Sequence, residues 1–345
     1  MSIKDSPSTG KKDQQMIRKA ISILLVLSVI GWGWRLAEAA EAASKAVFAY
    51  GAINAYLTST WIAREQGFFR KHNVEVQPVF IIATQAAQAM LAGEVQFGLI
   101  GPTHVINSVA AGSDMVMIMG NQNKVRYQLI AHPSIKRAED LKGKTFGIGA
   151  SMAGLASLAA LMALDHLGLN PRRDNITLLP TGAEPSRLAA LKGGTTQATV
   201  IAPEISKAAI AEGFPLLVDM AKLNIPFQAT GLTVMRKTLR NEPVMVDRVG
   251  RALTDSVRFI INPANKNVVV SSMMKNLRIS ERMRAEEVYA DLVEDLPRSI
   301  CPTVPGVRSI AKLMTEFGIN PKAAQVKVEE VVDLTLCKRW GGEAS

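Results

Sequence analysis

The sequence predicts an α/β fold with two lobes, each a parallel-rich sheet flanked by helices, and a helical C-terminal part. Three observations support this prediction. The chain has 345 residues, which is more than one ordinary core of about 100–150 residues holds. From residue 45, short β-type runs alternate with helical patterns. One βαβ unit then recurs further along the chain. The composition, 48% hydrophobic and 20% charged, is typical of a well-packed α/β protein.

The alternation of apolar patterns gives the order of the elements. The first half predicts strands at 45–50, 74–80, 96–100, 115–120 and 126–131, and helices at 57–71, 84–92 and 103–111. The pattern then begins again, with strands at 145–148, 176–179 and 198–201, and helices at 153–167, 184–192 and 203–212. After a last strand at 231–235, the chain is expected to be almost wholly helical to about residue 317.

An internal repeat relates the two halves. Residues 74–103 and 176–204 share one order of strand, loop, Ala/Leu-rich helix, glycine, strand and proline, although two unrelated βαβ units could also look this similar. If the repeat is real, two similar lobes face each other. Ligands of open α/β sheets bind outside the carboxyl ends of the strands. Crossings near residues 131 and 229 would then form a hinge that closes around a ligand.

The expected domain boundaries follow from this layout. Residues 45–131 and 229–300 form lobe 1, and residues 132–228 form lobe 2. Residues 301–345 form C-terminal helices and a tail, and residues 1–39 form a signal peptide with an N-terminal extension.

The N-terminal segment indicates the compartment. A basic pair precedes an apolar run from Ala20 to about Trp34, and the small-residue site Ala37-x-Ala39 follows. This is the three-part pattern of a cleaved secretory signal. The run of about 15 residues is shorter than the roughly 20 that a spanning helix needs. We therefore expect a periplasmic chain that begins at Ala40 or within three residues of it. No cysteine follows the run, so a lipid anchor is not expected.

Two questions about the ends of the chain stay open. Either Met1 or Met16 could be the true start. Cys301 and Cys337 are the two cysteines of the chain, and two thiols in an oxidising compartment often pair. Closing a loop of about 36 residues would stabilise the fold by about 3.8 kcal/mol in the chain-entropy model. The alternative is two buried free thiols.

Several function classes are disfavoured by composition and spacing. The net charge is +10, but the basic residues are scattered without a long run, which argues against nucleic-acid binding. The two cysteines and four histidines lack metal-ligand spacing, so no metal or cofactor is expected. The histidines also lie apart from any evident Ser or Cys nucleophile, so no enzymatic reaction is predicted.

A glycine-rich turn at 147–154 resembles a dinucleotide fingerprint only in part. The third glycine of that motif would fall at Met152, so nucleotide binding is disfavoured. The turn could still present free helix N–H groups at Ser151 to an anion or a carbonyl oxygen. Ser151 as a plain N-cap is the competing interpretation. Glu184 and Glu204 begin predicted helices, where the helix dipole explains a carboxylate and a ligand contact is the alternative.

Residues 45 to about 253 resemble the periplasmic binding proteins for aliphatic sulfonates, taurine and nitrate, and for the thiamine pyrimidine precursor. The stretches that carry the resemblance are 63–69 (AREQGFF) with 74–76 (VEV), 89–97 (AMLAGEVQF), 134–135 through 140–145 (DLKGKT), and 167–171 (LGLNP) with Asp174. Gln96 and Gln197 depart from the family pattern, which usually has Asp after the glycine.

The resemblance implies a two-lobed type II periplasmic binding protein fold. It implies capture of a small polar or anionic organic molecule (sulfonate, nitrate-like or pyrimidine-like) and delivery to an ABC transporter permease of the inner membrane. A monomer is expected. An enzyme on the same bilobal fold, acting on a small heterocycle, is the alternative. By position, the cleft would be lined by Asn54, Tyr56, Thr84, Pro102, Thr103, Asn121, Ser151, Met152, Thr181, Pro203 and Glu204, with Phe227 covering the site.

Overall fold

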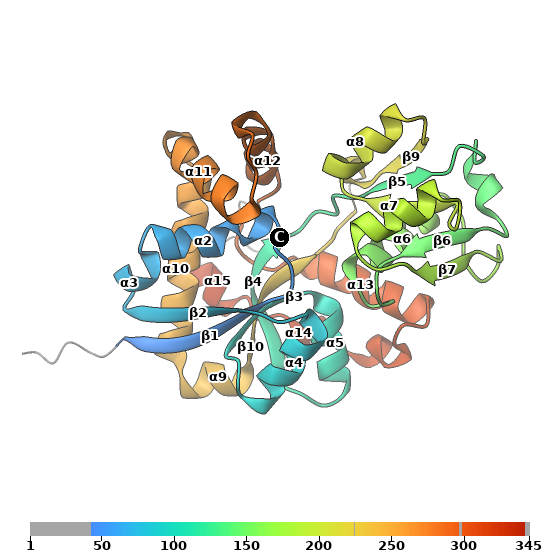
Figure 1. Cartoon of the computed structure of the whole chain (residues 1–345). Coiled ribbons are helices and arrows are strands. Elements are labelled where there is room, and N and C mark those ends of the chain that lie inside the picture. The colour runs from blue at the N-terminus through green and yellow to red at the C-terminus, as the bar shows by residue number, and fades with distance from the viewer. Residues whose placement is uncertain (1–42, 224, 297–298, 342–345) are drawn as a thin grey trace, which may run out of the picture. The chain divides into compact units, whose positions relative to one another are not determined.

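The computed structural model describes residues 43–223, 225–296 and 299–341. The predicted signal peptide and its cleavage site lie outside the described residues. Two five-stranded sheets form in the described part of the chain (Figure 1). The first has the strand order β2-β1-β3-β10-β4 and the second has the order β7-β6-β8-β5-β9.

The first sheet is mixed. Strand β1 runs parallel to β2 and β3, whereas β10 runs antiparallel to β3 and β4. The expected helix at 57–71 is interrupted, because Gly67 adopts a left-handed conformation with φ of 74°. The elements are β1 (Ser44–Tyr50), η1 (Ala55–Leu57), α2 (Thr58–Glu65), α3 (Phe68–Lys71), β2 (Val74–Phe80), α4 (Ala83–Ala92), β3 (Phe97–Ile100), α5 (Pro102–Ala110), β4 (Met115–Gln122) and β10 (Thr230–Met235).

The second sheet has the same arrangement. Strand β6 is parallel to β7 and β8, and β5 is antiparallel to β8 and β9. The elements are β5 (Gln128–Ala131), η2 (Ala138–Leu141), β6 (Thr145–Ile148), α6 (Leu155–His166), β7 (Thr177–Pro180), α7 (Glu184–Lys192), β8 (Ala198–Ile201), α8 (Pro203–Ala211), β9 (Leu216–Asp219) and η3 (Met220–Lys222).

Two details of the second sheet differ from the sequence analysis. Residues 126–131 were expected in lobe 1, but β5 pairs with β8 and β9, so the chain crosses between the sheets before Gln128. Periodicity identifies a strand and not its partners, so the sequence alone predicts the crossing near residue 131, after β5 instead of before it. Strand β9 was not expected at all. It has four residues between a proline and a 3-10 turn, and it lies at the edge of its sheet.

Gln96 and Gln197 make equivalent contacts in the two sheets. The Gln96 Oε1 atom accepts a hydrogen bond from the backbone N–H of Val47 in β1 at 2.9 Å. The Gln197 Oε1 atom accepts one from the backbone N–H of Thr145 in β6 at 3.1 Å. In both cases Nε2 donates to the carbonyl oxygen of the glycine three residues earlier. Each side chain therefore ties the second strand in the spatial order of its sheet, β1 or β6, to the turn between a helix and the third strand, β3 or β8.

The chain after β10 is helical, as predicted. Helix α10 packs on α2 and α3 beside the first sheet. The elements are α9 (Arg236–Asn241), α10 (Pro243–Ile261), η4 (Pro263–Asn265), α11 (Lys266–Leu277), α12 (Arg282–Asp295), α13 (Val304–Glu316), η5 (Pro321–Gln325), α14 (Val328–Val331) and α15 (Thr335–Arg339). No helix in the described ranges is both long and apolar enough to cross a membrane.

The C-terminal segment 299–341 is attached to the first sheet. A disulfide joins Cys301 and Cys337. The backbone N–H of Gly120 in β4 donates to the Ile300 carbonyl at 2.8 Å, and the backbone N–H of Asp333 donates to the Met117 carbonyl at 2.9 Å. Both ends of the segment therefore lie along strand β4.

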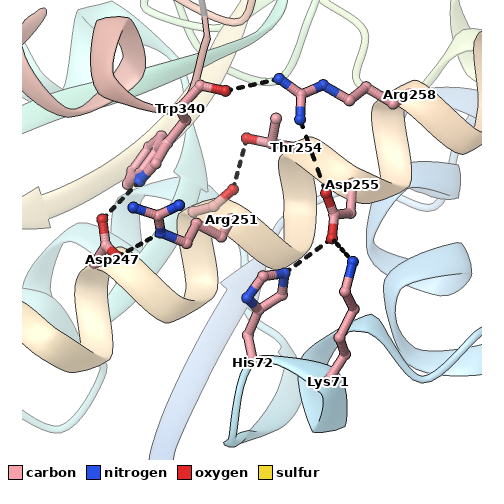
Figure 2. Close-up of polar contacts among 9 residues, drawn as sticks. Lys71, His72, Asp247, Arg251, Thr254, Asp255, Arg258 and Trp340 are labelled. Atoms are coloured by element: carbon pink, nitrogen blue, oxygen red, sulfur yellow. Dashed lines mark hydrogen bonds and ion pairs between the residues drawn. The ribbon is translucent and has the colours of Figure 1, made fainter.

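Trp340 fixes the last helix on α10 (Figure 2). Its indole Nε1 donates to Asp247 Oδ1 at 2.9 Å, and Arg258 Nη2 donates to its carbonyl oxygen at 3.0 Å. A Cβ atom on Gly250 would overlap the indole ring, so a glycine is needed at this position. Figure 2 also shows Asp255 of α10 bound by Lys71 at 2.7 Å and near His72 at 2.9 Å, which ties α10 to the turn before β2.

Candidate functional site

Two adjoining cavities lie where the parallel strands of both sheets end. The larger has a volume of about 290 Å³ and the smaller about 230 Å³. Asn54, Gln122, Tyr127 and Leu155 line both. The location agrees with the rule that open α/β sheets bind ligands beyond the carboxyl ends of their strands.

Helix starts form much of the wall of the larger cavity. Its lining includes Gly101 and Pro102 at the start of α5, and Gly154 and Leu155 at the start of α6. Gly101 and Gly154 are the N-caps of these helices, and neither helix has a side-chain cap bond. Pro102 lacks an N–H, and the N–H groups of His104 and Ser157 already donate to the carbonyls of their N-cap residues. The remaining first-turn N–H groups can donate to an acceptor group of a ligand. Among the described residues that line this cavity, none is a Lys or Arg.

Thr103 connects the two sides of the larger cavity. Its side chain is buried, and Oγ1 donates to the Ala153 carbonyl before α6 at 3.0 Å. His104 Nδ1 lies 3.2 Å from the same Oγ1. Because the hydroxyl proton is directed to Ala153, Nδ1 of a neutral His104 must be the donor in this pair. Burial lowers the pKa of His104, which favours the neutral ring.

A charge network forms one wall of the smaller cavity. Arg126 Nη1 lies 2.9 Å from Asp295 Oδ2, and Arg126 Nη2 lies 3.2 Å from Asp291 Oδ1. The Tyr56 hydroxyl also donates to Asp295 Oδ2 at 2.9 Å. Burial opposes the charge of Arg126, but the carboxylates of Asp295 and Asp291 outweigh it and raise the pKa of Arg126. Asp295 is only 4% exposed, so this ion pair is largely shielded from water.

The smaller cavity is also lined by Tyr127 and Glu184, and Arg187 of α7 contacts both. This arginine is 3% exposed, and it donates to the carbonyls of Val200 at 3.1 Å and Gly182 at 2.7 Å. Its guanidinium carbon lies 5.9 Å from the ring centroid of Tyr127, and Nη2 lies 3.6 Å from Glu184 Oε1. Burial, together with Glu184, raises the pKa of Tyr127 to about 12, so Tyr127 presents a neutral phenol.

Five of the residues expected in the cleft line one or both cavities. Asn54 lines both, Tyr56 lines the smaller, and Pro102, Thr103 and Phe227 line the larger. The Asn54 Oδ1 atom accepts from the Tyr56 backbone N–H at 3.1 Å and caps η1. Phe227 is 1% exposed and packs in the cavity wall from the second crossing.

Six of the other expected residues do not line either cavity. Thr84 is exposed on α4, Asn121 is buried and donates to the Tyr56 carbonyl, and Thr181 Oγ1 donates to the Ile148 carbonyl. Ser151 and Met152 precede α6, and Pro203 begins α8. The side chain of Glu204 lies outside the described part of the structure.

Ser151 occupies a different local position from the one expected. Helix α6 begins at Leu155, after the expected start at residue 153, and its N-cap is Gly154, so the competing interpretation of Ser151 as a plain N-cap is wrong. The Ser151 carbonyl accepts from the Gly154 N–H at 3.1 Å and from Ser157 Oγ at 2.6 Å. These bonds extend the turn by three residues before the helix can begin.

Sequence reasoning missed most of the polar groups in the cavities. The missed residues are His104, Gln122, Arg126, Tyr127, Gln228, Thr230, Asp291 and Asp295. The spacing of Asp291 and Asp295 places both on one face of α12, which is a usable signal. Nothing in their local sequence indicates that this face meets the cleft.

Comparisons with known proteins agree with this geometry. A model of the family described as NMT1/THI5 like matches residues 54–266. The alkanesulfonate-binding protein SsuA of Xanthomonas axonopodis pv. citri, bound to MOPS, is 17% identical with a TM-score of 0.63, over 85% of this chain and 99% of that one. The periplasmic nitrate-binding protein NrtA of Synechocystis PCC 6803 is 12% identical with a TM-score of 0.65, over 86% and 88%.

An enzyme has the same fold. A DszB mutant in complex with biphenyl-2-sulfinic acid is 17% identical with a TM-score of 0.60, over 86% of this chain and 99% of that one. A search of curated protein sequences found no match. The structural similarities confirm the predicted two-sheet periplasmic binding protein fold with a helical C-terminal region.

Proposed function

Because the chain belongs to the NMT1/THI5 like family, we propose that it is the solute-binding component of an ABC importer. In this role it captures a small molecule between two lobes, carries out no chemistry on it, and delivers it to a membrane permease. Similarity to a sulfonate-binding and a nitrate-binding protein supports this proposal. We further propose a cleaved signal peptide, a periplasmic location and a monomeric state.

The observation that carries the proposal is a pair of cavities whose walls come from both sheets. Helix starts of α5 and α6 meet in the larger cavity, and α12 and α7 face each other across the smaller one. The hydrogen bond from Thr103 to Ala153 joins the two sides. Two chain segments, before β5 and before β10, cross between the sheets, which suits hinge closure around a ligand.

The lining indicates the kind of ligand. In the larger cavity, the free first-turn N–H groups can donate to an acceptor, and Leu155, Leu158 and Phe227 supply apolar contact. The described lining includes no Lys or Arg to balance two negative charges. We propose a small polar organic molecule with one acceptor group, either neutral or singly charged. A sulfonate, a nitrate-like anion and a pyrimidine-like ring all meet this description.

The same lining supports binding instead of catalysis. His104 is the histidine of the larger cavity, and its described partner is a Thr103 hydroxyl that donates to a backbone carbonyl. A hydroxyl committed in this way is not paired as a nucleophile with a base. The rival function, an enzyme on the same fold, would require another reactive pair in the cavities.

Native mass spectrometry of protein purified from the periplasm tests the function. We expect a retained small molecule, and calorimetry of the stripped protein with taurine, an alkanesulfonate, nitrate and a hydroxymethylpyrimidine extends the search. Thr103→Val should weaken binding of the compound found by roughly 5- to 10-fold, the value of about one hydrogen bond. Ser151→Ala, outside both cavities, is the control. Chemical conversion of the compound, or no binding at all, would contradict the proposal.

A further inference from the structure

The two segments that cross between the sheets meet at one buried side chain, Gln228. This residue belongs to the second crossing and is 0% exposed. Its Nε2 donates to the Gln122 carbonyl, at the start of the first crossing, at 3.1 Å, and to the Thr230 carbonyl at 2.7 Å. The neighbouring Ala229 N–H also donates to the Gln122 carbonyl at 2.7 Å. Gln122 and Thr230 are the paired end residues of β4 and β10, so the amide of Gln228 fixes the crossings at the point where both leave the first sheet, beside the larger cavity.

The C-terminal segment contacts the same point. Gln228 Oε1 accepts from the Thr303 backbone N–H at 2.8 Å, and Thr303 Oγ1 donates to the Phe227 carbonyl at 2.9 Å. A Cβ atom on Gly306 would overlap the backbone of Phe227, so the start of α13 lies directly against the crossing. Three separate chain segments thus meet around one amide.

The disulfide anchors this contact to the first sheet. Cys301 lies two residues before Thr303 and is bonded to Cys337. The adjacent Ile300 carbonyl accepts from Gly120 in β4 at 2.8 Å. Thr303 is therefore held by a covalent bridge on one side and by Gln228 on the other.

Helix α13, which follows Thr303, extends the contact to both sides of the cleft. It packs against α5 beside the first sheet and against α6 beside the second. Ile310 of this helix lines the larger cavity. The position of the C-terminal segment consequently affects both the crossings and the cavity wall.

We propose that Gln228 is the positioning residue of the hinge. Together with the Cys301–Cys337 bridge, its amide limits the relative motion of the two sheets and holds Phe227 in the cavity wall. The consequence for ligand affinity rests on the proposed binding function, but the limit on motion does not. Gln228 bonds to both crossings and to the C-terminal segment, whereas Gln96 and Gln197 each tie a strand to a turn within one sheet.

Spin labels on the two sides of the cleft test the proposal without any ligand. Glu94→Cys at the end of α4 and Lys207→Cys on α8 are exposed positions for maleimide-linked labels. Electron–electron double resonance should give one narrow distance in the otherwise unchanged protein. We expect that narrow distance to be lost in Gln228→Ala and in the Cys301→Ser/Cys337→Ser pair. Amide exchange at Thr303 should rise by about tenfold, as expected for the loss of one hydrogen bond.

Gln96→Ala is the matched control, because Gln96 makes the same two kinds of backbone bond away from the cavities. It should keep the narrow distance. If Gln228→Ala fails to fold, the spin-label distance in the Cys301→Ser/Cys337→Ser variant decides the test. An unchanged distance distribution in the folded variants would overturn the proposal. A Gln96→Ala variant as broad as Gln228→Ala would overturn it too. Because no ligand is used, failure to capture a solute would contradict only the proposed function.

Discussion

The first and second sheets share one strand order but differ in what surrounds them. In each, three parallel strands are followed by an antiparallel strand and then an edge strand. Strands β1 and β2 have seven residues and β4 has eight, whereas every strand of the second sheet has four. Helix α10 packs beside the first sheet, and the disulfide-bonded segment 299–341 is hydrogen-bonded to strand β4 of that sheet.

This difference separates the repeated units, which build both sheets, from the segments outside the repeat. The repeated parts supply helix starts and the paired glutamines. The charged wall of the smaller cavity comes from parts without a repeat counterpart, namely the first crossing with Arg126 and helix α12 with Asp291 and Asp295. Two similar halves therefore build the cleft, and the added segments supply the charged wall of its smaller cavity.

Removing a charge outside the repeat should lower the free energy of unfolding more than any other substitution considered below. Asp295→Ala leaves Arg126 without its closest, shielded partner, and loss of one member of a buried pair typically costs about 3 kcal/mol. We expect urea denaturation to show a free energy of unfolding lower by about this amount. Asp291→Ala, whose carboxylate is 38% exposed, is the matched control and should change it by under about 1 kcal/mol. Equal losses of unfolding free energy in the two variants would show that the pair of Arg126 and Asp295 does not stabilise this wall more than the exposed Asp291 does.

Replacing either of the paired glutamines, Gln96 or Gln197, should lower the free energy of unfolding by a smaller amount, equal for the two. Gln96→Ala and Gln197→Ala each remove an acceptor for a strand N–H and a donor to a glycine carbonyl. We expect each to lower the free energy of unfolding by about 1–2 kcal/mol. Values that differ by more than about 1 kcal/mol would mean that the two sheets are not energetically equivalent.

The turns before β2 and β7 have the same backbone conformation but are held by different contacts. Asn73 and Asn175, each directly before a buried residue (Val74 and Ile176), both have a positive φ, of 52° and 51°. The first turn is held by Asp255 from α10, whereas the second is held locally by Asp174, which accepts from the Asn170 N–H at 2.7 Å. The same backbone conformation is thus stabilised from a distance in one sheet and within the loop in the other.

Acid should therefore act on the two turns through different carboxylates. The hydrogen bond from Arg173, with that from Asn170, lowers the pKa of Asp174 to about 2. A lowered carboxyl pKa gives stability that is present above the unfolded value of about 3.9 and lost as the pH falls toward the folded one. We expect Asp174→Asn to reduce the change in stability between pH 4 and pH 2. Asp255→Asn should reduce it too, because hydrogen bonds from Lys71 and His72 outweigh burial and lower that pKa. An unchanged pH profile in both variants would contradict this assignment.

The sequence predicts the repeated scaffold well for a physical reason. Strands and helices of the βαβ units carry their own periodicity, so nine of the ten strands in the described part of the chain are predicted from local patterns. Strand β9 escapes because its four residues owe their conformation to pairing with β5. The sheet to which β5 belongs is likewise decided by hydrogen bonds to β8 and β9, which no local pattern encodes.

The site is predicted only where it depends on the repeat. Pro102 and Thr103 are found because they follow a strand and begin a helix, which places them at the carboxyl end of the sheet. Asp295 is missed because α12 reaches the cleft through tertiary packing. Ser151 is misplaced because its carbonyl bonds to Gly154 and Ser157 delay the start of α6.

The attachment of segment 299–341 to β4 also has a consequence for solubility. Strand β4 is the last strand of its sheet, and an open edge strand is a template for pairing with another chain. The Ile300 carbonyl and the Asp333 N–H occupy hydrogen-bonding groups of Gly120 and Met117 on that edge. A chain shortened to residue 299 would leave these groups, and eight consecutive buried residues, open to intermolecular pairing. The C-terminal segment is therefore also a guard against aggregation through the β4 edge.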